Sequence, residues 1–142
     1  MQIDSTKDFT RPRVKVLARF RSPERVEEVL GGMGITASRA ETAPNPAWNC
    51  SIHWREADRA FTARLSEPAP DETMVLDIAS DLANAAITMD FYDLPDGGCR
   101  VISKAVIDPR TMLVRLALQS LRLVRGKAEE RLTRLVAALG RG

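Results

Sequence analysis

The sequence contains a single histidine, His53, and only two cysteines, Cys50 and Cys99. One histidine and two separated cysteines do not supply the three or four clustered ligands that a metal site needs, so no metal site is predicted. The cysteines have no CxxC-type spacing, and a reducing cytosol would oppose a disulfide between them. We therefore expect both cysteines to be small, buried hydrophobic residues.

Long apolar runs and a strong charge of one sign are also missing. The sequence has no stretch of about 18 apolar residues, the length that would span a membrane. The segment Met1–Lys7 lacks the apolar core of a secretory signal. The sequence therefore predicts a cytoplasmic protein. The net charge of +2 is too small to predict binding to nucleic acid. Arginines nevertheless gather towards the C-terminus, where Glu129 and Glu130 are the only acids after Asp108.

Catalytic and nucleotide-binding motifs are absent as well. The sequence has no GxSxG, HExxH, P-loop or GxGxxG pattern. His53 alternates with tryptophans along an expected strand, which places it on the polar face, exposed and without a catalytic role. The carboxylate pairs Asp77/Asp81 and Asp90/Asp93 are likewise expected on a solvated sheet face. We predict no catalytic residue and no cofactor, so the sequence gives no support for enzymatic activity.

The N-terminal third predicts a strand and two short helices. Residues Gln2–Phe9 alternate loosely, as in a strand. A first helix is expected after Thr10, its candidate cap, with Pro12 in the first turn. Ser22-Pro23-Glu24 is a second helix start, with a serine cap and an acidic first turn. The pair Gly31-Gly32 ends that helix.

From about Ile35 to Ile107 the apolar period changes to two, which is typical of half-buried strands. Short turns separate the runs, so the strands are expected to pair antiparallel. The apolar face of this six-stranded run contains Trp48, Cys50, Ile52, Trp54, Phe61, Leu65, Leu76, Ile78, Ile87, Met89 and Phe91.

A single C-terminal helix is predicted from Thr111 to Leu139, roughly 43 Å long at 1.5 Å per residue. Gly126 lies inside this helix and could weaken or bend it. The first half is apolar on nearly every side, and the residues beyond the core stripe are Met112, Val114, Leu118 and Leu121. Either the sheet covers this half on more than one side, or it presents a contact surface for a partner.

The order strand, two helices, six strands and long helix resembles the helix-grip fold of the SRPBCC superfamily, also called START-like or Bet v 1-like, which includes polyketide cyclases and coenzyme Q-binding proteins. The resemblance covers residues 1–142, which we expect to form one domain of the α+β class. The residues on which the resemblance rests locally are Pro12, Trp54, Gly97–Val101 and Asp108-Pro109. The stretch Gln119–Arg125 is similar to small bacterial members without assigned activity.

The resemblance implies a curved antiparallel sheet of about seven strands, wrapped around the long helix, with a cavity between them. The first hypothesis is non-enzymatic binding of a small hydrophobic or lipid-like ligand in that cavity. Trp54 and Phe91 would supply rigid contact area, and Ser120 a polar contact. The candidate lining residues are Trp48, Ile52, Trp54, Phe61, Leu76, Ile87, Met89, Phe91, Leu113, Leu116 and Ser120.

Two alternatives belong to other functional classes. One is a cyclase- or hydrolase-like enzyme that acts through polar groups in the pocket, and it predicts ionisable residues converging on the cavity. The other is a structural or interaction protein with a filled core, acting through dimerisation. If the C-terminal helix is exposed, its apolar residues and arginines suit a homodimer seam or contact with an anionic membrane surface.

Overall fold

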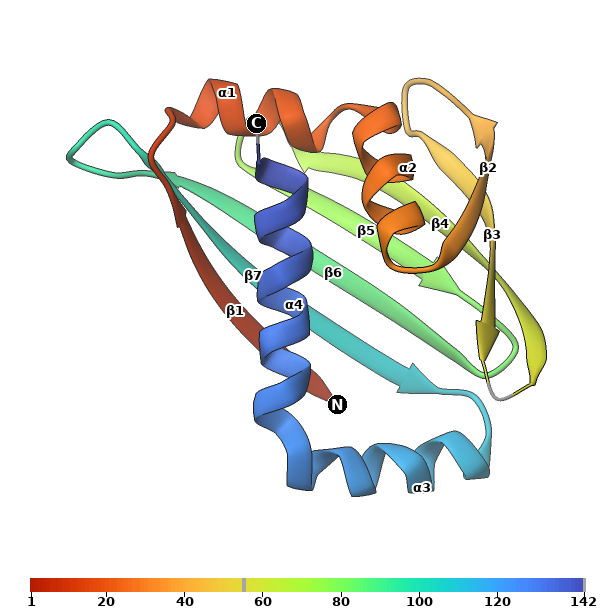
Figure 1. Cartoon of the computed structure of the whole chain (residues 1–142). Helices are drawn as coiled ribbons and strands as arrows, with labels where there is room; N and C mark the ends of the chain where they lie inside the picture. The colour runs from red at the N-terminus through yellow and green to blue at the C-terminus, as the bar shows by residue number, and fades with distance from the viewer. Residues whose placement is uncertain (55, 142) are drawn as a thin grey trace.

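Seven strands form one curved sheet in the computed structural model, which describes residues 1–54 and 56–141 apart from the side chains of Trp54, Leu121 and Val124. The strand order is β1-β7-β6-β5-β4-β3-β2, and every neighbouring pair is antiparallel. This confirms the α+β helix-grip architecture (Figure 1). The strands are β1 (Gln2–Phe9), β2 (Ile35–Glu41), β3 (Ala47–Trp54), β4 (Ala57–Ala69), β5 (Thr73–Ala79), β6 (Ala83–Asp93) and β7 (Cys99–Pro109).

Two helices, α1 (Arg13–Phe20) and α2 (Pro23–Gly32), connect β1 to β2. The second helix begins as predicted, because the Ser22 hydroxyl accepts a hydrogen bond of 3.3 Å from the backbone N–H of Arg25. The first helix does not use Thr10 as its cap. Pro12 occupies that position with an extended backbone, and its carbonyl accepts hydrogen bonds from the first turn.

The alternating pattern of the strands places the expected residues on the concave face of the sheet. Trp48, Leu76 and Met89 are buried there, and so is Cys50. Cys99, on β7, is also buried, and burial raises the pKa of both thiols. Both cysteines are therefore buried small residues, as the sequence predicts.

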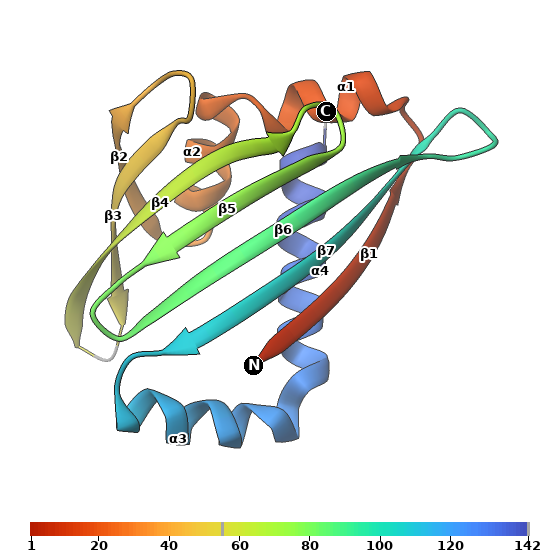
Figure 2. The same cartoon turned by 180° about the vertical axis from the view of Figure 1, so that it is seen from behind.

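The prediction of one continuous helix from Thr111 to Leu139 is wrong. The segment folds as α3 (Met112–Leu121), a 3-10 turn at Arg122–Val124 and α4 (Arg125–Gly140). Figures 1 and 2 show α3 running along one end of the molecule, roughly across the direction of α4. A 3-10 turn tightens the backbone, and Gly126, in the first turn of α4, weakens the helical preference at the break.

Helices α4 and α2 cover opposite sides of the concave face. Helix α4 packs over β1, where the hydroxyls of Ser5 and Thr133 form a 2.7 Å hydrogen bond. Helix α2 packs against β2 on the other side. The middle of the sheet lies between the two helices, and this arrangement positions the site described below. No helix in the part of the chain that the structure describes is long and apolar enough to cross a membrane.

Candidate functional site

A cavity of about 580 Å³ lies between the middle of the sheet and the facing sides of α2 and α4. We call it the sheet cavity. Its walls are mainly apolar, and four polar residues lie at the end near the β3–β4 and β5–β6 turns. The lining residues are Leu30, Met33, Ile35, Ile52, Asp58, Arg59, Ala60, Phe61, Ala63, Leu76, Ile78, Ser80, Asp81, Leu82, Ala83, Ala85 and Leu135.

The other end of the concave face is filled by side chains. Phe20 of α1 packs edge-to-face on Phe91, with ring centroids 5.1 Å apart, and on Phe9, at 6.4 Å. Val136 of α4 is fully buried in the same core. One concave surface therefore has a packed half near α1 and a hollow half between α2 and α4.

An ion-pair network holds α2 against the sheet beside the cavity. The Arg39 guanidinium of β2 donates to both carboxylate oxygens of Glu27, at 2.7 and 2.8 Å, and the indole N–H of Trp48 donates to the same carboxylate at 2.9 Å. The hydrogen bonds from Arg39, and then that from Trp48, lower the pKa of Glu27, against an opposing effect of burial. Three elements are thus tied together through one carboxylate.

The sheet cavity opens into a charged groove between α2 and α4, with a volume of about 770 Å³. Met33, Ile52 and Leu135 line both spaces, so the groove continues the cavity. We call this space the arginine groove, because four of its lining residues are arginines and only one is acidic. Its walls are formed by Arg25, Glu28, Val29, Gly32, Met33, Ile52, Arg131, Arg134, Leu135, Ala138 and Arg141.

The structure divides the predicted ligand-binding residues into separate groups. Ile52, Phe61 and Leu76 line the sheet cavity together. The residues placed instead in the packed core are Trp48, Ile87, Met89 and Phe91. The side chain of Trp54 lies outside the described residues.

The predicted positions of Leu113, Leu116 and Ser120 over the sheet are wrong. All three are exposed on α3, and none of them lines the sheet cavity or the arginine groove. The cause is the turn before α4, which directs α3 along the end of the sheet instead of across it (Figure 1).

Several cavity residues were not among the predicted ones. Leu30 and Met33 come from the end of α2, Ile35 from β2 and Leu135 from α4. The apolar stripe of α2 carried a usable signal for Leu30, since a stripe must face a core. His53 is exposed, and its Nδ1 lies 2.9 Å from an oxygen of Asp58. It is not among the residues that line the cavity.

No family model matches the chain, and no curated protein matches it in sequence. Solved structures do match its fold. The TTHA0849 protein from Thermus thermophilus is 12% identical with a TM-score of 0.73, over 99% of this chain and 94% of that one. The Zhui aromatase/cyclase from Streptomyces sp. R1128 is 11% identical with a TM-score of 0.61, over 93% and 95% of the two chains.

A third structural match is a START superfamily protein from Mycobacterium smegmatis, 10% identical with a TM-score of 0.60, over 92% of this chain and 95% of that one. At these identities the similarity shows a common fold. The chain therefore has the START-like helix-grip fold that its element order predicts.

Proposed function

We propose that this helix-grip domain binds a small apolar or lipid-like molecule in the sheet cavity and does not transform it. The observation that carries the proposal is the cavity itself, a mainly apolar space of about 580 Å³ that the core leaves unfilled. Binding pockets for small molecules range over roughly 300–1,000 Å³ and have apolar walls with a few polar groups. A structural protein with a filled core has no need of such a space.

The polar residues of the cavity favour binding over catalysis. Asp58 and Asp81 are exposed at the turn end, where solvent competes for their interactions. These two carboxylates therefore lie at an open rim, and Arg59, half-buried at the same end, is the other ionisable residue of the lining. The cyclase- or hydrolase-like alternative requires such groups to converge on the apolar interior. The match to an aromatase/cyclase supports the fold on which such a pocket is built.

Filling the cavity tests the proposal. Ala85 of β6 lines the sheet cavity, and its neighbour Ala86 does not. Ala86 lines a separate depression together with Asn84 and Asp108. Ala85→Phe is expected to weaken binding of the neutral fluorescent probe Nile red by about tenfold, equivalent to about 1.4 kcal/mol, because the new ring takes up the ligand's space. Ala86→Phe adds the same ring outside the cavity and is expected to leave binding unchanged.

The readouts are Nile red fluorescence during titration and thermal unfolding of all three proteins. Equal weakening by both variants, at equal stability, would contradict the proposal. A wild-type protein that does not enhance Nile red fluorescence at all would also contradict it.

A further inference from the structure

The arginine groove lies at the opening of the sheet cavity, and its charge is strongly one-sided. Its lining contains four arginines and a single carboxylate, that of Glu28. Arg25 is already engaged, because its Nη2 donates to the carbonyls of Ala138 and Arg141, at 3.0 and 2.7 Å, and its Nη1 lies 3.5 Å from Glu28. Arg25 therefore joins α2 to the end of α4 and fixes the width of the groove.

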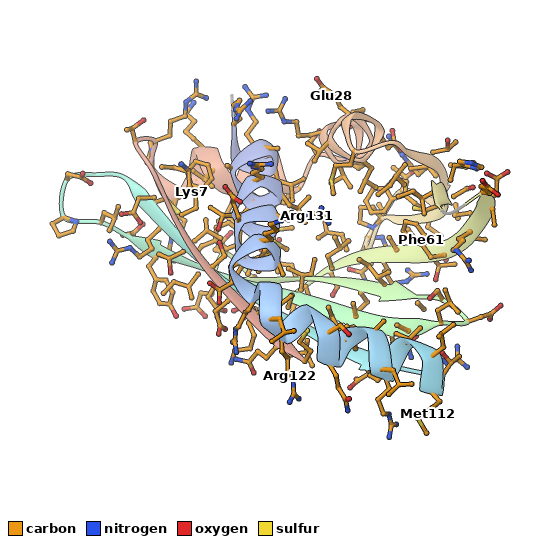
Figure 3. All side chains as sticks on the ribbon, turned by 60° about the horizontal axis from the view of Figure 1, so that its bottom comes forward. Lys7, Glu28, Phe61, Met112, Arg122 and Arg131 are labelled. Carbon is orange, nitrogen blue, oxygen red and sulfur yellow. The ribbon has the colours of Figure 1, made fainter. Side chains whose placement is uncertain are left out.

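The other cations of the groove have few protein partners. Arg134 makes one exposed ion pair, 3.4 Å from Glu130. Arg131 makes no hydrogen bond or ion pair with the described residues. Figure 3 shows Arg131 and Phe61 on two sides of the space between α4 and β4. The groove thus offers guanidinium groups that are available to a ligand beside an apolar cavity.

The spacing along α4 couples the charged and apolar parts of the site. Arg131 and Leu135 are one helical turn apart and share a face, and both line the groove. Leu135 also lines the sheet cavity. A molecule whose apolar part lies in the cavity can therefore extend past Leu135 and place its other end near Arg131.

We infer that the ligand is an anionic amphiphile, with its apolar part in the sheet cavity and its carboxylate or phosphate head between Arg131 and Arg134. This inference rests on the proposed function and adds the chemical class of the ligand. Guanidinium groups match both head groups, because their planar donors bind two oxygens at once.

Isothermal titration with dodecanoate, dodecyl phosphate and dodecanol, each below its micelle concentration, tests the inference. We expect at least one anion to bind about tenfold more tightly than dodecanol, because hydrogen bonds to a charged group are stronger than those to a neutral one. The comparison of the two anions identifies the head group. Arg131→Gln with Arg134→Gln is expected to remove the preference and leave dodecanol affinity unchanged.

The matched control is Arg115→Gln with Arg122→Gln, which removes the same charge from α3 and the turn after it, outside the groove. This control is expected to keep the preference for the anion. Equal affinity of both anions and the alcohol would overturn the inference and leave the proposed function standing. An equal loss of the preference in the control would also overturn it, and absence of all binding would overturn both proposals.

A second inference rests on a different feature, the exposed apolar surface of α3. Met112 is 67% exposed, Leu113 76% and Leu116 54%, and Leu123 of the following turn is 89% exposed. Val114 and Leu118 are only half-buried. Figure 3 shows Met112 and Arg122 extending away from the sheet. Of the two interpretations of this half of the helix, the structure therefore supports an uncovered contact surface.

The charges around α3 indicate what covers this surface. Arg110, Arg115, Arg122, Arg125 and Lys127 are the only ionisable residues between Asp108 and Glu129. Arg115 lies on α3, and Arg110 and Arg122 flank it, so pairing α3 with α3 of a second copy would bring these cations together with no acid on α3 to balance them. Arg125, on α4, already forms ion pairs with Asp4 and Glu129. A ten-residue helix is also only about 15 Å long. Two such helices have little surface to bury against each other, compared with the roughly 1,000 Å² that a stable interface buries.

We propose that α3 binds the surface of anionic bilayers, with its exposed leucines in the interface and its arginines at the lipid phosphates. Co-sedimentation with phosphatidylcholine vesicles containing 30% phosphatidylglycerol is expected to recover most of the protein at low salt. Pure phosphatidylcholine vesicles are expected to recover little, because they lack the negative surface potential that attracts basic residues.

Leu113→Gln with Leu116→Gln is expected to reduce the bound fraction at least fivefold. The control, Ile102→Gln with Val106→Gln, changes two exposed apolar residues of β7 and is expected to bind normally. No binding to anionic vesicles by the wild-type protein would overturn the proposal. A concentration-dependent dimer in analytical ultracentrifugation that the Leu113/Leu116 variant abolishes would also overturn it, in favour of a second copy.

Discussion

Phe20→Ala is expected to lower the free energy of unfolding by about 3–5 kcal/mol, the range for removing a fully buried aromatic side chain. Phe20 is 1% exposed and packs edge-to-face on two other phenylalanines, Phe9 and Phe91. These rings join α1, β1 and β6, so the substitution leaves a void where three elements meet. Chemical denaturation followed by circular dichroism measures the change.

A useful control for Phe20 is Val14→Ala on the same helix, since Val14 is 67% exposed. It is expected to change stability by less than about 0.5 kcal/mol. Similar losses in both variants would show that α1 is not anchored through Phe20 and would contradict the described packing.

Gly98→Ala is expected to destabilise the fold by about 2 kcal/mol or more, because overpacking a rigid site costs about 1–3 kcal/mol. A Cβ at Gly98 would collide with the backbone carbonyl oxygen of Phe9, and a backbone atom of a paired strand cannot rotate away. Phe9 pairs with Cys99 at this end of β1 and β7. The collision therefore forces the edge strand to shift.

The matched control is Gly126→Ala at the start of α4, where an added Cβ meets nothing within 4 Å. It is expected to be neutral or to stabilise by up to about 1 kcal/mol, as alanine favours a helix more than glycine does. The two variants make the same chemical change, so opposite effects on the melting temperature isolate the contact with Phe9. A stable Gly98→Ala protein would contradict the close approach of the two strands.

The sheet could be predicted from the sequence because alternation is a local signal. The run from Trp48 to Trp54 changes face at every residue, and Trp48, Cys50 and Ile52 do lie on the concave side. The start of α2 could also be predicted from the sequence, since Ser22 and Pro23 determine it within one turn. Such features depend on neighbouring residues alone.

The break before α4 and the hollow half of the core depend on contacts between distant residues. Both α3 and α4 have helical periodicity, so the pattern does not reveal that Arg122–Val124 changes the direction of the chain. Trp48 and Ile52 share a face of β3, yet one is buried in the core and the other lines the cavity. The positions of α2 and α4 over the strand decide this difference.

The most direct test of the sheet cavity is a methyl NMR titration of the isotope-labelled protein with dodecanoate. The largest shift changes are expected at Leu30, Ile52 and Leu135, which line the cavity, with little change at Val16 and Leu17 in the packed core. Shift changes confined to the exposed leucines of α3, or no change at any methyl group, would contradict a ligand held between α2, α4 and the sheet.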